Sequence, residues 1–315
     1  MTAATAAVRA PRRLGDSVFS GAALAGGLLI LVALAAVAIF LVAQALPGLT
    51  ASKSDIQTLS PSATSFWDYV PSLVFGTIWA ALLALVIAVP FSLGIALFIS
   101  HYAPRRLARG LGAVVDLLAA VPSVVFGAWG VVVLAPFAQP FYSFLVTFLG
   151  WIPLFAGPVS ADGRTILTAA LVLAVMIIPI ISALSREIFL QTPRLNEEAA
   201  LALGATRWEM IRMAVLPFGR AGIVSASMLG LGRALGETLA VTLVLSPNLI
   251  ISFFLLTSDK NPSTIAQNIA LQFPDSFGVD VNVLIATGLI LFVITFAVNA
   301  IARAVVGRRG GGKGI

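Results

Sequence analysis

The sequence predicts an all-α membrane protein with six transmembrane helices. Of the 315 residues, 59% are hydrophobic and only 10% are charged, and the mean hydropathy of +1.04 exceeds what a water-soluble core of this length requires. The apolar residues form six runs that each reach the roughly 20 residues needed to cross a bilayer core. Because these runs are continuous rather than alternating, they exclude a transmembrane β-barrel.

The predicted spans lie near residues 21–46, 71–100, 112–138, 164–188, 216–246 and 281–305. The first could be mistaken for a signal peptide, because basic residues precede it and Ala43-Gln44-Ala45 resembles a cleavage site. Its apolar run is longer than the roughly 7–15 residues of a signal peptide. We therefore expect an uncleaved membrane anchor.

The orientation follows from the basic residues. Of the 19 Lys and Arg residues, 15 fall on one side of the predicted spans and only Lys53, Arg164 and Lys260 on the other, while Arg233 lies within the fifth span. Basic residues favour the cytoplasmic side, so we expect both termini in the cytoplasm of a multi-pass protein of the cell membrane. The net charge of +6 is explained by the orientation of the protein in the membrane. It therefore does not indicate nucleic-acid binding, and we expect no nucleic-acid partner.

Between the spans, the chain divides into segments of different composition. We expect a cytoplasmic tail over 1–20, the first helix over 21–46, an external loop over 47–70, a five-helix core over 71–306 and a flexible basic tail over 307–315. A second external loop, 247–280, is rich in polar residues typical of irregular surface structure. Residues 139–163 are apolar but interrupted by Pro and Gly, which is compatible with an interfacial or re-entrant excursion or with a floppy loop.

The segment 193–215 predicts a pair of short cytoplasmic helices. Thr192-Pro193 is typical of a helix start, and Gly204 of a helix end. Thr206-Arg207-Trp208-Glu209 has the pattern of a capping box. The following helix carries an apolar stripe of Trp208, Ile211 and Val215. A segment that only linked two spans would not need two capped helices. We therefore interpret the helical pair as a docking element for a soluble partner.

The fifth predicted span contains Arg233 and Glu237, four residues apart and hence on one face of a continuous helix. A charge at mid-bilayer costs at least about 2.5–3.5 kcal/mol, so the two side chains either pair to hold helices together or face an aqueous path. In the second case Arg233 would bind an anion, because its fork of donors matches two oxygens of an oxyanion. Glu237 would neutralise Arg233 when the site is empty, and Thr238 would add a hydroxyl or bond its own backbone.

Asp116 lies near the start of the third predicted span, before Pro122-Ser123. Asp116 either sits at the cytoplasmic boundary or partners Arg233 across helices. Because an acid repels an anion, we assign Asp116 a structural or gating role, and we assign Ser123 the same role. The chain has no cysteine and a single His, and no cluster suited to metal binding or catalysis can be assembled. We therefore expect neither a metal site nor an enzyme.

A channel or a secondary transporter would have no use for the capped helical pair, so we favour neither class.

One long motif resembles a known family. Glu198-Ala199-Ala200, followed by Gly204 and by Ala214-Val215-Leu216-Pro217, resembles the E-A-A…G…I-x-L-P signature of permease subunits from binding-protein-dependent ABC importers. Ala214 departs from the pattern, which has Ile there. The runs PSLVFGTIWAALLALVIAVPFSLGIALFIS and GLGRALGETLAVTLV resemble the PstC-type permeases of phosphate-specific ABC importers.

The resemblance implies a type I permease fold, with Glu198, Ala199, Ala200, Gly204, Leu216 and Pro217 coupling the chain to an ATPase dimer. It also implies a second homologous permease subunit, an external phosphate-binding protein, and ATP and Mg on the ATPase, with no cofactor on this chain. Phosphate is the implied cargo, with sulfate or molybdate as the alternative oxyanion. An ATP-independent anion channel or secondary transporter is the less favoured alternative.

Overall fold

The computed structural model describes residues 14–310. Within that range the chain is helical, apart from loops and one isolated bridge between Asn248 and Pro262. Six helical stretches are long and apolar enough to cross a membrane, which confirms the predicted class. They are Val18–Leu49, Phe66–Tyr102, Ser123–Leu149, Ile166–Leu190, Arg207–Leu235 and Val279–Ala304.

The α-helices in chain order are α1 (Leu14–Leu49), α2 (Lys53–Ile56), α3 (Phe66–Leu97), α4 (Arg105–Ala119), α5 (Ser123–Trp129), α6 (Ala135–Leu149), α7 (Ile166–Leu190), α8 (Arg194–Ala202), α9 (Arg207–Met210), α10 (Leu216–Leu235), α11 (Leu239–Val244), α12 (Ile265–Gln272) and α13 (Val279–Gly310). Three π-helical turns join consecutive helices: η1 (Phe98–Tyr102), η2 (Gly130–Leu134) and η4 (Ile211–Val215). Short 3-10 turns follow α6, α11 and α12: η3 (Pro153–Phe155), η5 (Ser258–Lys260) and η6 (Phe273–Asp275).

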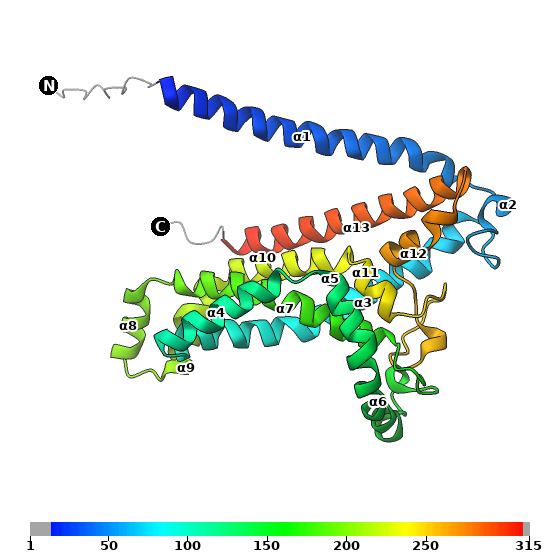
Figure 1. Cartoon of the computed structure of the whole chain (residues 1–315). Coiled ribbons are helices and arrows are strands. Elements are labelled where there is room, and N and C mark those ends of the chain that lie inside the picture. Colours follow the sequence, from blue (N-terminus) through cyan, green and yellow to red (C-terminus); the bar gives the residue numbers. More distant parts are fainter. Residues whose placement is uncertain (1–13, 311–315) are drawn as a thin grey trace.

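Helix α7 forms the centre of the bundle. It packs against α3, α4 and α10 (Figure 1), and two thirds of its most apolar window is buried, more than in any other candidate span. Alanines on one face of α3, including Ala80, Ala84 and Ala88, are buried in this core. Small side chains at four-residue spacing let two helix backbones approach closely, as is common between membrane helices.

Helix α1 stands apart from this bundle. It packs mainly on α13, near its own C-terminal end, and the two helices diverge from there (Figure 1). At the packed end Ala45 is fully buried, and the amide of Asn282 donates to the backbone oxygen of Gln44 at 2.7 Å. No residue in the most apolar 18-residue stretch of α1 is buried by the rest of the described chain. The helix also starts earlier and ends later than the predicted range 21–46.

The region 247–280 differs from the expected irregular surface loop. It contains α12, whose Gln267 and Asn268 are buried. Gln267 donates to the Leu245 oxygen at 2.8 Å, and the N–H of Ile265 donates to the Thr77 hydroxyl at 2.9 Å. These polar residues are inside because each finds a partner there, as buried polar groups must.

The third and fifth predicted spans each differ from the observed helices. The expected helix over 112–138 is interrupted at Ala120–Pro122, which separates α4 from α5. The expected helix over 216–246 is interrupted at Gly236–Thr238, which separates α10 from α11. The residues on both sides of each interruption are apolar, so the hydropathy of the whole run did not reveal either break.

Residues 139–163 are helical as far as Leu149 and, apart from η3, irregular beyond it, so the segment is not a loop throughout. Helix α6 continues to Leu149 and turns away from the bundle (Figure 1). Tyr142 is fully buried, with its hydroxyl 2.8 Å from that of Thr168. The basic tail predicted over 307–315 falls partly on the end of α13 and otherwise outside the described residues.

Candidate transport site and coupling helices

The interruption after α10 defines the surroundings of the predicted anion site. Arg233 lies in the last turn of α10, which ends at Leu235. The side chain of Glu237 is only 8% exposed, and its carboxylate accepts a hydrogen bond from the N–H of Ala240 at 3.1 Å. The carboxylate therefore caps the N-terminus of α11, where the helix dipole favours negative charge.

The expected pairing of Arg233 with Glu237 on one helical face is absent from the structure. Among the described residues only two contacts between basic and acidic side chains form, His101–Glu197 and Arg186–Asp116, both at 3.5 Å. The four-residue spacing aligns two side chains only while the helix continues, and this helix stops between them. Arg233 is exposed in the isolated chain, so its guanidinium is open to a ligand or a partner.

Thr238 follows the same interruption. Its hydroxyl donates to the backbone oxygen of Gly236 at 3.2 Å, which is the backbone-bonding alternative for this residue. The Thr238 side chain is therefore half-buried and engaged in the turn between the two helices. At this turn Arg233 is therefore exposed, whereas Glu237 is buried with its carboxylate bonded to the first turn of α11.

The two interrupted helices meet after their breaks. Helix α5 packs closely on α11, because Gly127 has no side chain: a Cβ there would lie 2.7 Å from the Cα of Ala240. Broken helices at membrane depth are tolerated where the freed backbone groups are buried in protein or line a cavity. In transporters, such discontinuities commonly mark the substrate site.

Asp116 lies on α4, outside the observed third span, and its side chain is 55% exposed. It pairs with Arg186 of α7 at 3.5 Å, so it ties α4 to the central helix. Ser123 begins α5, directly after the break. The two residues lie on either side of the first interruption, and Asp116 pairs with Arg186 and not with Arg233.

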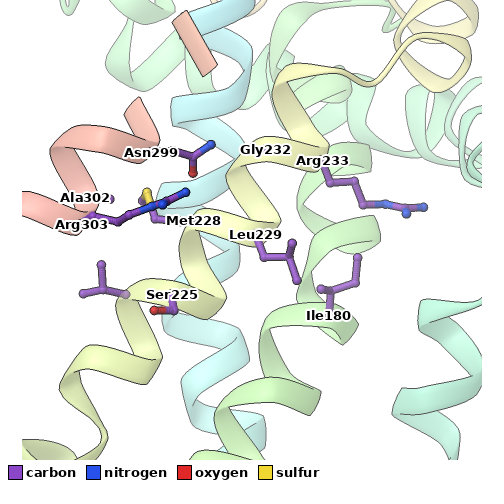
Figure 2. A pocket seen from close by; sticks show the side chains of 10 residues that line it. Ile180, Ser225, Met228, Leu229, Gly232, Arg233, Asn299, Ala302 and Arg303 are labelled. Carbon is purple, nitrogen blue, oxygen red and sulfur yellow. The ribbon is translucent and has the colours of Figure 1, made fainter. Parts of the chain in front are cut away.

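Arg233 also lines a cleft of about 710 Å³ between α7, α10 and α13. Figure 2 shows the side chains around it, with Arg233 on one flank of α10 and Asn299 and Arg303 of α13 on the other. Sequence reasoning did not single out Asn299 or Arg303, since one arginine near the end of the last span fits the cytoplasmic excess of basic residues.

The predicted helical pair is present as α8 and α9. Gly204 has a φ of +84°, and the N–H groups of Gly204 and Ala205 donate to the oxygens of Leu201 and Ala200 at 3.0 and 3.2 Å. This is a Schellman motif, which requires the left-handed conformation that glycine adopts at little cost. The Thr206 and Glu209 capping box is formed, with Glu209 accepting from the Thr206 N–H at 2.7 Å.

Two local details differ from expectation. Helix α8 begins at Arg194 with Pro193 as its cap, and the hydroxyl of Thr192 is buried without a hydrogen-bond partner. Trp208 is 54% exposed, whereas Ile211 and Val215 are fully buried. Trp208 lies in α9, and the π-helical turn η4 that follows it contains the two buried residues.

The pair is anchored on one side and open on the other. Ala200 packs into a cluster with Phe189, Met210 and Ile211, and His101 of η1 contacts Glu197. Glu198 and Ala199 are exposed, as are Gly204 and Pro217, while Leu216 is half-buried. The outer surface also carries large apolar side chains: Leu195, Leu201, Leu203 and Trp208.

Six apolar helical stretches, two interrupted helices and a capped helical pair beyond the bundle are typical of a membrane transport subunit. The family model described as "binding-protein-dependent transport system inner membrane component" matches residues 88–310. This chain belongs to that family.

Relatives extend over nearly the whole chain. The phosphate transport system permease protein PstC 2 of Mycobacterium tuberculosis is 48% identical over 304 residues, covering 94% of this chain and 93% of that protein. The permease protein PstC of Mesorhizobium japonicum is 40% identical, covering 92% and 89%. Among solved structures, a bacterial ABC transporter involved in alginate import aligns with a TM-score of 0.61 at 15% identity over 93% of this chain and 96% of that chain, which shows a shared fold.

Proposed function

We propose that this chain is the permease subunit of an ATP-driven importer for inorganic phosphate, with the type I permease fold. The observation that carries the proposal is the 40–48% identity to proteins named phosphate transport permeases over most of both chains. The geometry around Arg233 supports the same cargo. Both termini face the cytoplasm in this proposal, because the sequence assigns 15 of the 19 basic residues to one side of the predicted spans.

Arg233 is the anion ligand of the proposed path. Its guanidinium stays charged at any physiological pH and offers paired donors to two phosphate oxygens. Glu237 forms no ion pair with Arg233 in the structure, and its carboxylate accepts from the Ala240 N–H instead. An arginine without an internal partner at the end of a broken helix therefore needs a counter-ion, and the transported anion supplies it.

The helical pair α8–α9 couples the path to ATP hydrolysis on a separate ATPase dimer, where ATP and Mg bind. Its exposed residues Glu198, Ala199 and Gly204 form the contact surface. Because α8 ends in a Schellman motif and the chain continues through the capping box of α9 and through η4 into α10, a push on α8 is passed to α10. The remaining partners are an external phosphate-binding protein and a second, homologous permease.

Uptake of radiolabelled phosphate by proteoliposomes containing the assembled transporter tests this function. We expect ATP-dependent uptake by the wild type, loss of the ATPase subunits in Glu198→Lys, and retained ATP hydrolysis without uptake in Arg233→Ala. Arg233→Lys keeps the charge but not the fork, so we expect it to lose most uptake while the complex assembles.

The same vesicles separate the alternatives. An excess of unlabelled sulfate or molybdate should not compete with phosphate; competition by either would indicate a different or broader oxyanion cargo. Uptake that proceeds without ATP would indicate a channel or secondary transporter and would contradict the proposed importer.

A further inference from the structure

A second cleft, of about 690 Å³, lies beside α4 at the end of α7 that leads into α8. Its walls come from η1, from α4, which packs on α7 (Figure 1), from the last turns of α7, and from Arg194, the first residue of α8. It shares no lining residue with the cleft beside Arg233. The proposed transport path therefore does not account for it.

One face of α4 forms a wall of this cleft. The α4 residues that line it recur at helical spacing and share that face: Arg105, Ala108, Arg109, Gly112, Ala113 and Asp116. The face is turned toward α7, because the guanidinium of Arg186 lies against Gly112, where a Cβ would collide with it. The same guanidinium lies 3.5 Å from the carboxylate of Asp116.

The opposite face of α4 is apolar. Its residues Leu107, Val114 and Leu118 are 47%, 52% and 45% exposed. A short helix that is apolar on one side and basic on the other is typical of the boundary between membrane and water. The arginines at the start of α4 are thus separated from its apolar side, and two of them face the cleft.

The lining of the cleft is positively charged. Four arginines contribute to it: Arg105, Arg109, Arg186 and Arg194. Within the described part of the chain only Arg186 contacts an acid, so the other three have no acidic partner. Besides Asp116, the one further acid in the lining is Glu187. The first turn of α4 contains no acidic residue, although the helix dipole favours a negative charge there.

Topology alone explains basic residues at this end of the spans, but it does not require that they gather around one cleft. Arg106 illustrates the difference. It is exposed on α4, next to Arg105, and it does not line the cleft. Arg106 therefore provides a matched comparison for the arginines that do.

We propose that this cleft binds a phosphate-bearing anion through Arg105, Arg109 and Arg194, while Arg186 remains with Asp116. Guanidinium groups match pairs of phosphate oxygens, and basic clefts between membrane helices are typical sites for phosphate headgroups. The volume of about 690 Å³ lies within the range of small-molecule sites. Because Arg194 begins α8, the bound anion joins the helical pair α8–α9 to α4.

Two sources supply this chemistry, the headgroup of an anionic phospholipid and free inorganic phosphate. The experiment separates them by the composition of the nanodisc that holds the assembled transporter. One arm uses phosphatidylcholine with inorganic phosphate added at constant ionic strength. The other uses phosphatidylcholine mixed with phosphatidylglycerol and no added phosphate.

Cysteine labelling reports on the cleft, since the natural chain contains no cysteine. Ala108→Cys places a thiol in the lining. Gly110→Cys is the control on the same helix, because Gly110 is exposed, does not line the cleft, and has open space where a Cβ would lie. The rate is measured with an uncharged methanethiosulfonate reagent, so that the surface potential of the nanodisc does not alter it.

We expect one of the two anions to slow the labelling of Ala108→Cys several-fold and to leave Gly110→Cys unchanged. The anion that protects is the ligand. Arg109→Gln and Arg194→Gln, on different walls of the cleft, should each remove most of the protection, whereas Arg106→Gln should retain it. In phosphatidylcholine alone, Ala108→Cys should react several-fold faster with an anionic reagent than with a cationic one, because the neighbouring arginines attract it.

The inference is overturned if neither anion protects Ala108→Cys, if Gly110→Cys is slowed equally, or if Ala108→Cys does not react at all. Equal loss of protection in Arg106→Gln and Arg109→Gln would also overturn it, because the effect would then be one of total charge. Labelling requires no transport, so these outcomes leave the proposed phosphate import untouched. Absent uptake in the proteoliposomes would likewise refute the import without affecting this site.

Discussion

Replacing Glu237 tests whether its carboxylate caps α11 or pairs with Arg233. Glu237→Ala removes the acceptor for the Ala240 N–H. Loss of a helix cap costs about 0.5–2 kcal/mol, and an unsatisfied buried N–H costs about 1–3 kcal/mol. These figures describe the same bond, so we expect about 2 kcal/mol of lost stability. Glu237→Gln keeps an oxygen acceptor and should lose less than about 1 kcal/mol.

Thermal unfolding in nanodiscs, followed by the fluorescence of the five tryptophans, measures this loss. At about 2–4 °C per kcal/mol for a large domain, Tm should fall by about 4–8 °C in Glu237→Ala. A double-mutant cycle with Arg233→Gln supplies the sharper comparison. Since the two side chains do not touch, their effects should add to within about 0.5 kcal/mol. A coupling energy of about 1 kcal/mol or more would refute the capping role and restore the ion pair.

Three further substitutions probe the helix ends and the packing of α6. Gly204→Ala forces a side chain into a φ of +84°, at a cost of about 1 kcal/mol, and should lower co-purification of the ATPase subunits; unchanged co-purification would separate this turn from docking. Thr206→Ala removes the acceptor for the Glu209 N–H and should destabilise the chain by about 1 kcal/mol in thermal unfolding, with Thr206→Ser as the control that retains wild-type Tm. Tyr142→Phe loses the hydrogen bond to Thr168 and should likewise lower Tm, by about 1 kcal/mol of stability; a rise in Tm would show that this hydroxyl is not satisfied.

The sequence was sufficient for the features with local signals. Six apolar runs predicted six membrane helices because the length of a span is fixed by the bilayer. The ends of α8 and α9 were predictable because Gly204, Thr206 and Glu209 act on backbone groups within a few residues of themselves. Such signals depend on no distant contact, so a single sequence contains them.

The interruption of the fifth span had no comparable signal, and Pro122 at the third span's interruption did not distinguish a break from a kink, since Pro90 and Pro179 lie inside continuous helices. The break after Leu235 depends on Glu237 turning to cap α11, and the same Arg-to-Glu spacing fits an uninterrupted helix equally well. Helix α12 was missed because Gln267 and Asn268 suggest a surface loop unless their partners, Leu245 and Tyr69, are known to be adjacent. These partners come from other helices, and polarity alone does not predict them.

The packing of α1 sets the order in which the molecule can be completed. Its contact with the rest of the chain passes through Gln44 and Asn282, which are 238 residues apart in sequence. At a synthesis rate of about 5–20 residues per second, α1 waits roughly 12–48 s in the membrane before α13 emerges. A lone helix tolerates this delay because all its backbone hydrogen bonds are internal. The first helix to be made is therefore among the last to find its neighbour during biosynthesis.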